Sequence, residues 1–445
     1  MSRIARVYPV SNNLEGDMAK VKRRTLLQAS VGVLAAPQIM AQSKPEKLVY
    51  VGDNGPWHWV MVEEVAPAFE KATGIKIDFT LLPTDPWRTR LRTELGANSS
   101  GIDVVQWAVG MAGWISPFME DHTPLLEQMK VRDPNFDWSD YLAGTKKAGT
   151  YDGKLCGIPY RITTGIFHYQ RALLEQAGFS SPPGTWDELV KAALAVNKPP
   201  ERYGFGTMGL QGPGLYSGYA PFLYSNGGRL LDFKTGEVYI NQTKAVEALQ
   251  FYGDLNNKYK VVPPEAMTWA FDDIVAGGQS DRYAMTQLFA PYGTLINDPK
   301  ISRTGGKWAW STVQGPHSKE EGRTWIDGHF LGVPKYTKYK EWSLQFIAMC
   351  CAREWQKRAM IRGNAPPLRS VLEDPEMVER IGWPPVAAQA IETGFPTPGH
   401  PVWDTLEVQL RSAISQTLHG QKTAKDALDE TAVEWQRSLR RAGIR

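Results

Sequence analysis

The sequence predicts an α/β protein that folds around more than one hydrophobic core. From residue 48 onward, short apolar segments with a period of two alternate with segments of helical period. This alternation is typical of a parallel sheet covered by helices on both faces. The 445 residues suffice for two or more cores. Between Ile158 and Gly165 the pattern changes, which indicates that the chain leaves one structural unit and enters another.

The first part of the chain predicts three strands joined by two helices. The expected strands are 48–51, 75–81 and 102–107, and the expected helices are 57–72 and 85–95. The first helix follows the turn from Asp53 to Pro56 and is expected to end at Gly74, because glycine favours a helix C-terminus. Pro67 is expected to kink this helix, since proline has no N–H group to donate.

The stretch after residue 150 marks the expected crossing between the two units. Asp152 and Gly153 predict a tight turn between two short apolar segments. Proline cannot donate within a sheet, so a strand is expected to end near Ile158 or to lie at a sheet edge at Pro159. A new strand is expected over 166–169.

Helices dominate the remainder of the chain. Thr185 and Glu188 form the pattern of a capping box, which predicts that a helix begins there. Farther along, a strand is expected at 203–208, and helices are expected at 245–255, 339–362 and 404–418, with a last helix capped by Thr423.

The charge balance gives no indication of a basic binding face. The formal net charge is +3, but residues 1–41 hold six basic and two acidic residues. The rest of the chain has 44 basic and 45 acidic residues, which argues against nucleic acid or an anionic membrane as a partner. The 16 Trp and 17 Tyr residues form a high aromatic content, most of which belongs in cores while some can stack on a ligand.

Residues 1–41 have the pattern of a cleavable export signal. Arg23 and Arg24 precede an apolar run over 26–40 that is too short, and too rich in Ala, Gly and Ser, for a stable membrane-spanning helix. Paired arginines at this place resemble the twin-arginine type of signal, and cleavage is expected near Ala41. No cysteine follows the run, so we expect a protein free in the periplasm without a lipid anchor.

Two alternatives stay open at this point. Met18 is a second possible start, because the residues from there to the expected cleavage point form a complete signal. Cys156, Cys350 and Cys351 do not make a disulfide framework, and three buried thiols are the favoured interpretation. A single bridge from Cys156 to one of the other two is the alternative in an oxidising compartment.

Motifs of catalytic, nucleotide and metal sites find no support in the sequence. Residues 204–209 match a G-x-G-x-x-G string, but Gly212 to Gly214 follow at once and prevent the helix that a nucleotide fingerprint needs. The acid pairs 272–273 and 320–321 are typical of solvated surfaces, whereas acid–base catalysis needs two carboxylates across a substrate. We therefore expect no catalytic residue, no metal and no cofactor.

The central stretch contains short motifs in a fixed order. Residues 153–155 and 157–160 read GKL and GIPY, and residues 185–189 read TWDEL. They resemble the hinge strand and the following helix of the extracellular solute-binding proteins of bacterial ABC importers, in particular the sugar-binding family (family 1). Tyr169 keeps that family's tyrosine, while Gln170 replaces its usual asparagine.

The resemblance implies a two-lobed periplasmic-binding-protein fold, type II-like. In this fold each lobe is a mostly parallel sheet flanked by helices, and the ligand cleft lies at the hinge. The implied first lobe is 44–159 plus 330–370, and the implied second lobe is 162–327 plus 372–445.

The resemblance also implies a ligand site on the loops that face between the lobes. The implied residues are Asp53, Asn54, Trp87 and Trp107 in the first lobe, Tyr160, Arg161 and Gly328 at the crossovers, and Tyr216, Tyr219, Tyr292 and Trp403 in the second lobe, with Trp57 and Trp269 as further candidates. Aromatic faces stack on the C–H faces of sugars, and fixed polar groups bind their hydroxyls. Arg161 suits a pair of hydroxyls, or a carboxylate or phosphate in an acidic ligand, while a hinge salt bridge is its structural alternative.

The expected function is the capture of a carbohydrate, either a sugar, an oligosaccharide or a polyol, and its delivery to the membrane subunits of an ABC permease. We expect a monomer without enzymatic activity. One alternative is a secreted carbohydrate-active enzyme on a similar scaffold. The other is a binding protein for a peptide, a polyamine or a sugar phosphate, and a polyamine would require more cleft carboxylates than the evident Asp53 and Asp327.

Overall fold

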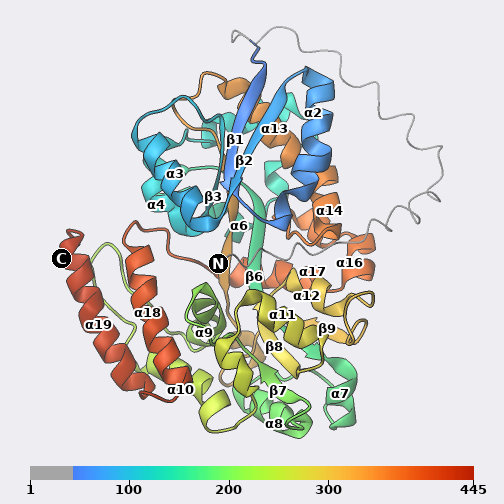
Figure 1. The fold of residues 1–445 in the computed structure, drawn as a ribbon, viewed down its shortest axis with the longest axis vertical. Helices are drawn as coiled ribbons and strands as arrows, with labels where there is room; N and C mark the ends of the chain where they lie inside the picture. Colours follow the sequence, from blue (N-terminus) through green and yellow to red (C-terminus); the bar gives the residue numbers. More distant parts are fainter. Residues whose placement is uncertain (1–43, 445) are drawn as a thin grey trace, which may run out of the picture. The chain divides into compact units, whose positions relative to one another are not determined.

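A nine-stranded sheet runs through the computed structural model, which describes residues 44–444 (Figure 1). The strand order is β2-β1-β3-β10-β6-β8-β7, with β11 paired to β10 and β9 paired to β6. The strands are β1 Lys47–Asp53, β2 Lys76–Leu82, β3 Val104–Ala108, β6 Ile158–Gln170, β7 Tyr203–Gly206, β8 Tyr283–Phe289, β9 Trp308–Ser311, β10 Trp325–Gly332 and β11 Phe395–Pro396. The predicted export signal lies outside the described residues.

The two ends of the sheet are parallel, and its middle is antiparallel. β1 pairs in parallel with β2 and β3, and β7 pairs in parallel with β8. β10 is antiparallel to β3 and to β6, and β6 is antiparallel to β8 and β9. The three strands predicted from the start of the chain overlap β1, β2 and β3, so the alternation of strand and helix is confirmed there.

β6 is continuous through the point where the sequence predicts an interruption. It runs for 13 residues from Ile158 to Gln170. The ladder with β10 shifts between His329 and Phe330, which leaves Tyr160 as the extra residue of a bulge beside Pro159. A bulge interrupts the regular ladder, and a proline without an N–H group is tolerated there. The expected end of the strand near Ile158 is therefore wrong, whereas the alternative of a sheet edge at Pro159 is confirmed, because among the described strands this part of β6 pairs only with β10.

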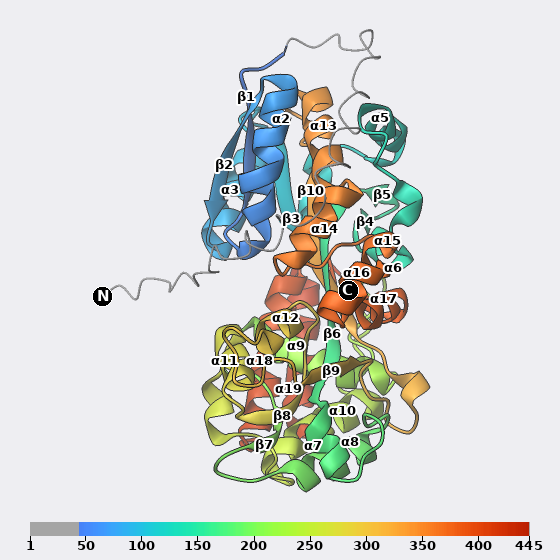
Figure 2. The ribbon, with the colours of Figure 1, turned by 90° about the vertical axis from the view of Figure 1, so that its right-hand side faces the viewer.

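Two hydrophobic cores share the central strands. The first core includes β1, β3, α2 (Ala66–Thr73), α3 (Thr84–Gly96) and α13 (Lys340–Cys350), and the second includes β7, β8, α9 (Pro213–Ser225), α10 (Thr243–Asn257), α18 (Trp403–Leu418) and α19 (Ala424–Arg441). In β6, Ile158 belongs to the first core and Tyr169 to the second. In β10, Phe330 belongs to the first core and Trp325 to the second. The two lobes are thus joined through these strands (Figure 2).

The first core extends farther along the chain than the expected boundary at residue 371. Met377, Trp383 and Ile391 are buried in the first core, and the second core resumes at Trp403. α17 (Pro384–Thr393) packs on β6, which keeps this segment with the first lobe. The chain therefore crosses back after Ile391, where β11 pairs with the start of β10.

The predicted helix over 57–72 is divided by a π-helical turn. This turn spans Met61–Val65, and the N–H of Ala66 donates to the carbonyl of Met61, five residues earlier. Pro67 follows directly in the first turn of α2 and has no N–H, so the irregular turn lies immediately before the proline. α2 continues the helix from Ala66.

The predicted helix over 339–362 is also two helices. α13 ends at Cys350, and α14 (Arg353–Ile361) begins after Ala352, whose backbone is extended at φ −69° and ψ 144°. The capping box at Thr185 is confirmed, because its side chain accepts from the N–H of Glu188 at the start of α8 (Trp186–Val196). The expectation that no helix follows the string 204–209 is wrong, because α9 begins at Pro213, where a proline in the first turn is tolerated. None of the helices within residues 44–444 has both the length and the apolar character to cross a bilayer.

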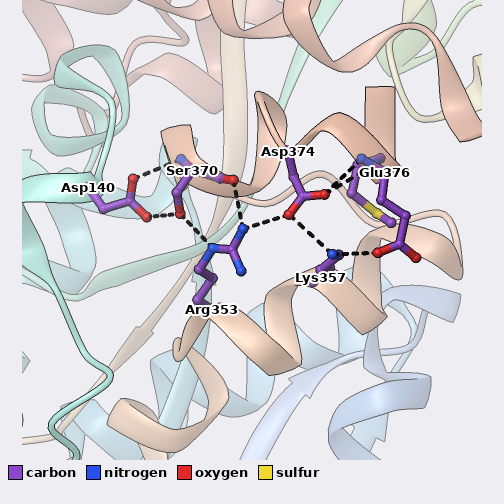
Figure 3. Close-up of polar contacts among 7 residues, drawn as sticks. Asp140, Arg353, Lys357, Ser370, Asp374 and Glu376 are labelled. Atoms are coloured by element: carbon purple, nitrogen blue, oxygen red, sulfur yellow. Dashed lines mark hydrogen bonds and ion pairs between the residues drawn. The ribbon is translucent and has the colours of Figure 1, made fainter. Parts of the chain in front are cut away.

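A polar network joins α14 to α16 (Pro375–Ile381) at the edge of the first lobe (Figure 3). Asp374 lies 2.6 Å from Arg353 and 3.1 Å from Lys357. Asp374 also caps α16, since its side chain accepts from the N–H of Glu376 at 3.0 Å. One carboxylate therefore fixes the N-terminus of one helix on two cations of another.

Candidate functional site

The carboxyl end of β1 places a buried carboxylate next to the crossing strands. Asp53 is 6% exposed, and its N–H donates to Oε1 of Gln106 on β3 at 2.6 Å. The indole N–H of Trp57 donates to Oδ1 of Asp53 at 3.0 Å. Because β1, β2 and β3 are parallel, their carboxyl ends meet at one edge, which is where α/β sheets present their ligand groups.

His329 on β10 lies beside this carboxylate. Its Nε2 is 3.7 Å from Oδ2 of Asp53, and its ring lies between Trp57 and Trp87, at centroid distances of 5.4 Å and 6.2 Å. Burial, followed by the charges of Arg161 and Arg88, lowers the pKa of His329 well below its usual value. The imidazole is therefore neutral, and within the described residues its Nδ1 has no hydrogen-bond partner.

Arg161 and Thr163 present polar groups from β6 on the same face. Arg161 pairs with His329 in the ladder, and Thr163 pairs with Asp327, so directly opposite residues share one side of the sheet. The guanidinium of Arg161 lies 4.3 Å from the centre of the Trp57 ring. Among the described residues, Nε of Arg161 and Oγ1 of Thr163 are buried without a hydrogen-bond partner.

Asp327 adds a second, partly buried carboxylate to this face. Its side chain accepts from the N–H of Gly328 at 2.7 Å. Burial raises the pKa of Asp327, and the positive charges of Arg161 and Arg88 oppose that rise. Asp53, Arg161, Asp327 and His329 thus form a polar cluster at the crossover, which we call the hinge cluster.

A pocket of about 410 Å³ opens next to the hinge cluster, between a helix of each lobe. α3 supplies one wall and α18 the other, and the lining residues are Arg88, Thr89, Arg92, Asp404, Glu407, Val408 and Arg411. Arg88 and Arg92 each approach Asp404 at 3.4 Å, so ion pairs connect the lobes across this pocket. The guanidinium of Arg92 also lies 4.4 Å from the centre of the Trp114 ring.

Two charged residues link the pocket with the hinge cluster. Arg88 lines the pocket and also lowers the pKa of both His329 and Asp327, although burial is the larger influence on each. Burial raises the pKa of Glu407, and Asp327 adds to the rise while Arg411 opposes it. The charges of the pocket therefore act on the groups of the hinge cluster.

Several residues expected from the sequence lie in this region. Asp53, Arg161 and Gly328 belong to or adjoin the hinge cluster, and Asn54 follows Asp53 with its N–H bound to the carbonyl of Leu82 at 2.7 Å. Trp87 presents its ring edge-on to His329. The hydroxyl of Tyr160 lies 3.4 Å from Nε2 of His58, behind the cluster.

The second lobe contributes Tyr216 and Trp403 at the far side. Their rings contact each other edge-on at a centroid distance of 5.5 Å. The hydroxyl of Tyr216 lies 3.0 Å from that of Tyr224, and burial, followed by Tyr224, Glu407 and Asp327, raises the pKa of Tyr216. Nε1 of Trp403 is buried without a hydrogen-bond partner in the part of the chain that the structure describes.

Two expected residues lie in the hydrophobic cores instead, and a third packs against an aromatic ring. Trp107 is fully buried and stacks on Phe330 at 4.4 Å in the first core. The hydroxyl of Tyr219 donates to the carbonyl of Ala245 at 2.9 Å in the second core. Tyr292, half-buried at the start of α12 (Tyr292–Asn297), has its ring 5.5 Å from that of Phe289. The structure does not bring these three to the hinge cluster.

The alternation of the strand explains the position of Trp107. In the ladder between β3 and β10, His329 pairs with Ala108 and Phe330 pairs with Trp107. Successive side chains point to opposite faces of a sheet, so Trp107 shares the face of Phe330, away from His329. Trp269, a further candidate, likewise packs in the second core, with its ring 6.2 Å from that of Tyr283.

Sequence reasoning missed His329, Arg88 and Glu407, and it named Asp327 without placing it in the site. A signal for two of them exists in the strand Trp325–Gly332, where Asp327 and His329 stand two positions apart among apolar residues. Polar side chains at that spacing in a buried strand share one face and require partners. Arg88 and Glu407 are on helices whose relative position no local pattern gives.

A larger pocket of about 750 Å³ lies in the second lobe, around Arg229, Tyr239 and Lys244. No residue of the hinge cluster lines it. The described residues contain no group of three or more His, Cys, Asp or Glu side chains placed to hold a metal ion. The three cysteines are buried free thiols.

The fold and the site define a two-lobed protein of the periplasmic-binding type, with a polar region between its lobes. The family described as "Bacterial extracellular solute-binding protein" matches residues 61–357, and the chain belongs to this family. A probable ABC transporter-binding protein of Deinococcus radiodurans is 22% identical over 362 residues, which cover 79% of this chain and 83% of that protein. An erythritol/L-threitol-binding protein of Mycolicibacterium smegmatis is 23% identical over 328 residues, covering 69% and 67%.

Solved structures have the same fold. The maltose-bound MalE3 of T. maritima superposes with a TM-score of 0.76 at 24% identity, covering 87% of this chain and 98% of that one. A solute-binding protein of Agrobacterium radiobacter in complex with ribitol gives a TM-score of 0.76 at 23% identity, covering 88% and 100%. These likenesses establish the two-lobed α/β fold that the sequence predicts.

Proposed function

We propose that the protein captures a sugar or polyol between its lobes and delivers it to the membrane permease of an ABC importer. The observation that carries this proposal is the set of buried polar atoms without partners along the region between the lobes. They are Nε of Arg88, Nε of Arg161, Oγ1 of Thr163, Nδ1 of His329 and Nε1 of Trp403. Buried polar groups are normally hydrogen-bonded, so such a set favours a ligand rich in hydrogen-bonding groups.

The chemistry of these groups suits hydroxyls. Arginine and indole N–H groups donate, the carboxylates of Asp53 and Asp327 accept, and a hydroxyl can do both. The ring of Trp57 is partly exposed beside Asp53, and an indole face suits the weakly polar C–H faces of a sugar or polyol. Relatives named for, or solved with, erythritol, L-threitol, ribitol, D-mannitol and maltose are consistent with this ligand class.

Binding and closure are coupled in this proposal. A ligand that contacts both β6 and α18 has more contacts when the lobes are closed, so it favours the closed state by its difference in affinity. The permease then receives the closed form. The proposal assigns the chain no chemical step. Export to the periplasm through the signal at 1–41 is part of the proposal.

A thermal-shift screen followed by calorimetry tests the function. The compounds are erythritol, L-threitol, ribitol, D-mannitol and maltose, with amino acids included because a relative from Sinorhizobium fredii is named as a probable amino-acid-binding protein. We expect a sugar or polyol to raise the melting temperature in proportion to the logarithm of its concentration over its dissociation constant. Recovery of the ligand unchanged after long incubation separates a binding protein from a carbohydrate-active enzyme. A chemically altered ligand would contradict the proposal.

A further inference from the structure

The charges around the region between the lobes are equal in number. The basic side chains are Arg88, Arg92, Arg161 and Arg411, and the acidic side chains are Asp53, Asp327, Asp404 and Glu407. His329 adds no charge, because burial lowers its pKa well below the usual value. The site can therefore accommodate an uncharged molecule without an excess of either sign.

The outer charges are neutralised by direct contact. Asp404 lies 3.4 Å from Arg88 and 3.4 Å from Arg92, so one carboxylate of α18 faces two guanidinium groups of α3. Arg411 binds Glu407 at 2.5 Å within α18. Asp404 and Glu407 thus form ion pairs with the three guanidinium groups of the pocket. The charge of Arg88 also acts on Asp327 and His329, whose pKa values it lowers.

Within the hinge cluster, Arg161 and Asp327 carry opposite charges and act on each other without a direct ion pair. Arg161 rests on the face of Trp57 and acts on Asp327, whose pKa is raised by burial and held back by Arg161 and Arg88. His329 is 9% exposed, and within the described residues its Nδ1 has no partner. A neutral, nearly buried imidazole with a free nitrogen indicates a hydroxyl as the group to be bound.

We propose that this site selects an uncharged polyhydroxylated ligand and that Asp404 determines this selectivity. By forming ion pairs with Arg88 and Arg92 from the opposite lobe, Asp404 makes these two guanidinium groups less available to a carboxylate or phosphate of the ligand, while the charge of Arg161 acts on Asp327. An anionic ligand would bring a further negative charge next to Asp53, Asp327 and Glu407, and a buried charge without a partner is strongly unfavourable. The inference rests on the proposed function and names the ligand class and the residue responsible.

Matched pairs of ligands test the proposal directly. Ribitol and D-ribonate, and D-mannitol and D-mannonate, have the same carbon chains and differ by one terminal CH₂OH or carboxylate. Calorimetry on the full chain gives the ratio of polyol to aldonate affinity for the wild type and for Asp404→Asn. The control is Glu430→Gln, which removes one acidic charge from the neighbouring helix α19. Glu430 forms an exposed ion pair with Lys422, which precedes that helix.

The wild type is expected to bind a polyol at least about 100-fold more tightly than its aldonate, which corresponds to two tenfold steps in the dissociation constant. Asp404→Asn frees a guanidinium charge, and we expect it to reduce this ratio by about tenfold or more, mainly by gaining aldonate affinity. Glu430→Gln is expected to leave the ratio unchanged. Salt should weaken the gained aldonate binding, because it depends on charge.

A second variant keeps the test decisive if Asp404→Asn does not fold. Glu407→Gln frees Arg411 in the same pocket and should also raise aldonate affinity. Equal binding of polyol and aldonate by the wild type, or an unchanged ratio in the folded variants, would overturn the selectivity. A wild type that binds none of the sugars and polyols would contradict the proposed function instead, so the two failures are distinguishable.

Discussion

Nε2 of His329 lies 3.7 Å from Oδ2 of Asp53, although the two residues are 276 positions apart in the sequence. The contact joins the carboxyl end of β1 to the middle of β10, and Trp57 contacts both partners. A neutral imidazole and a carboxylate held together in this way offer a donor and an acceptor to one hydroxyl. The predictions on ligand binding start from this arrangement.

Replacement of Arg161 by methionine is expected to weaken ligand binding by about tenfold to 100-fold, since one hydrogen bond to a charged group is lost. Methionine keeps part of the apolar contact with Trp57. Calorimetry with the tightest ligand of the screen measures the effect, and the melting temperature of the free protein should change little. Arg303→Met, at an exposed position of the second lobe, is the control. Wild-type affinity in the Arg161 variant would remove it from the site.

Replacement of Trp107 by alanine is expected to destabilise the first lobe by about 3–5 kcal/mol, because a fully buried indole stacked on Phe330 leaves a cavity. Urea unfolding measures this loss. The folded Trp107 variant should bind the ligand as tightly as the wild type. Any apparent loss of affinity should come from the unfolded fraction of the variant. Trp59→Ala removes a half-buried indole and should cost less. A stable Trp107 variant with weakened binding would restore this residue to the ligand site.

Stability is expected to fall as the pH decreases from about 6.5 toward 4. Burial lowers the pKa of His58, His122 and His168 to about 4. In the unfolded chain a histidine titrates near 6.5, so between these values the unfolded state binds more protons and stability decreases with falling pH. The contribution is complete above pH 6.5, and each group can account for up to about 3 kcal/mol.

Urea midpoints at pH 7.5 and pH 5 measure this dependence. His419→Gln, at an exposed position after α18, should retain the full decrease. Identical midpoints at the two pH values would contradict the buried, neutral state of these three histidines.

Replacement of Asp374 by alanine is expected to reduce stability by about 2 kcal/mol. The change removes the cap of α16 and the ion pairs with Arg353 and Lys357. Asp374→Asn keeps a capping oxygen and should recover about half of the loss. Thermal unfolding of the two variants separates the contribution of the helix cap from that of the ion pairs. An equal loss of stability in both variants would assign the effect to the ion pairs.

Local patterns predict the parts of the fold that depend on neighbouring residues. The alternation of strand and helix gives β1 to β3, and the capping box at Thr185 gives the start of α8. The π-helical turn before Pro67 and the bulge at Tyr160 were not predicted, since both depend on how the chain packs around a proline. The return of the chain to the second lobe lies beyond the expected boundary at residue 371, because α17 is held by contacts with β6, which no local pattern reveals.

The candidate site could be predicted in part for a similar reason. Asp53 follows a predicted strand and Arg161 follows the GIPY motif, and the structure places both in the hinge cluster. Trp107 faces the opposite side of its strand, and the register that decides this is set by pairing with β10. Arg88 and Asp404 meet across 316 residues of sequence, which only tertiary packing can produce.

The bulge at Tyr160 has a consequence for how the molecule bends. β6 and β10 are the strands that pass between the cores, and their ladder is irregular where Arg161 and His329 stand. A pair of strands is expected to bend most easily where its ladder is irregular, so the polar groups that would bind a solute lie at the hinge itself. A solute bound there would make the hinge more rigid, and small changes in the shape of the solute would change the angle between the two lobes.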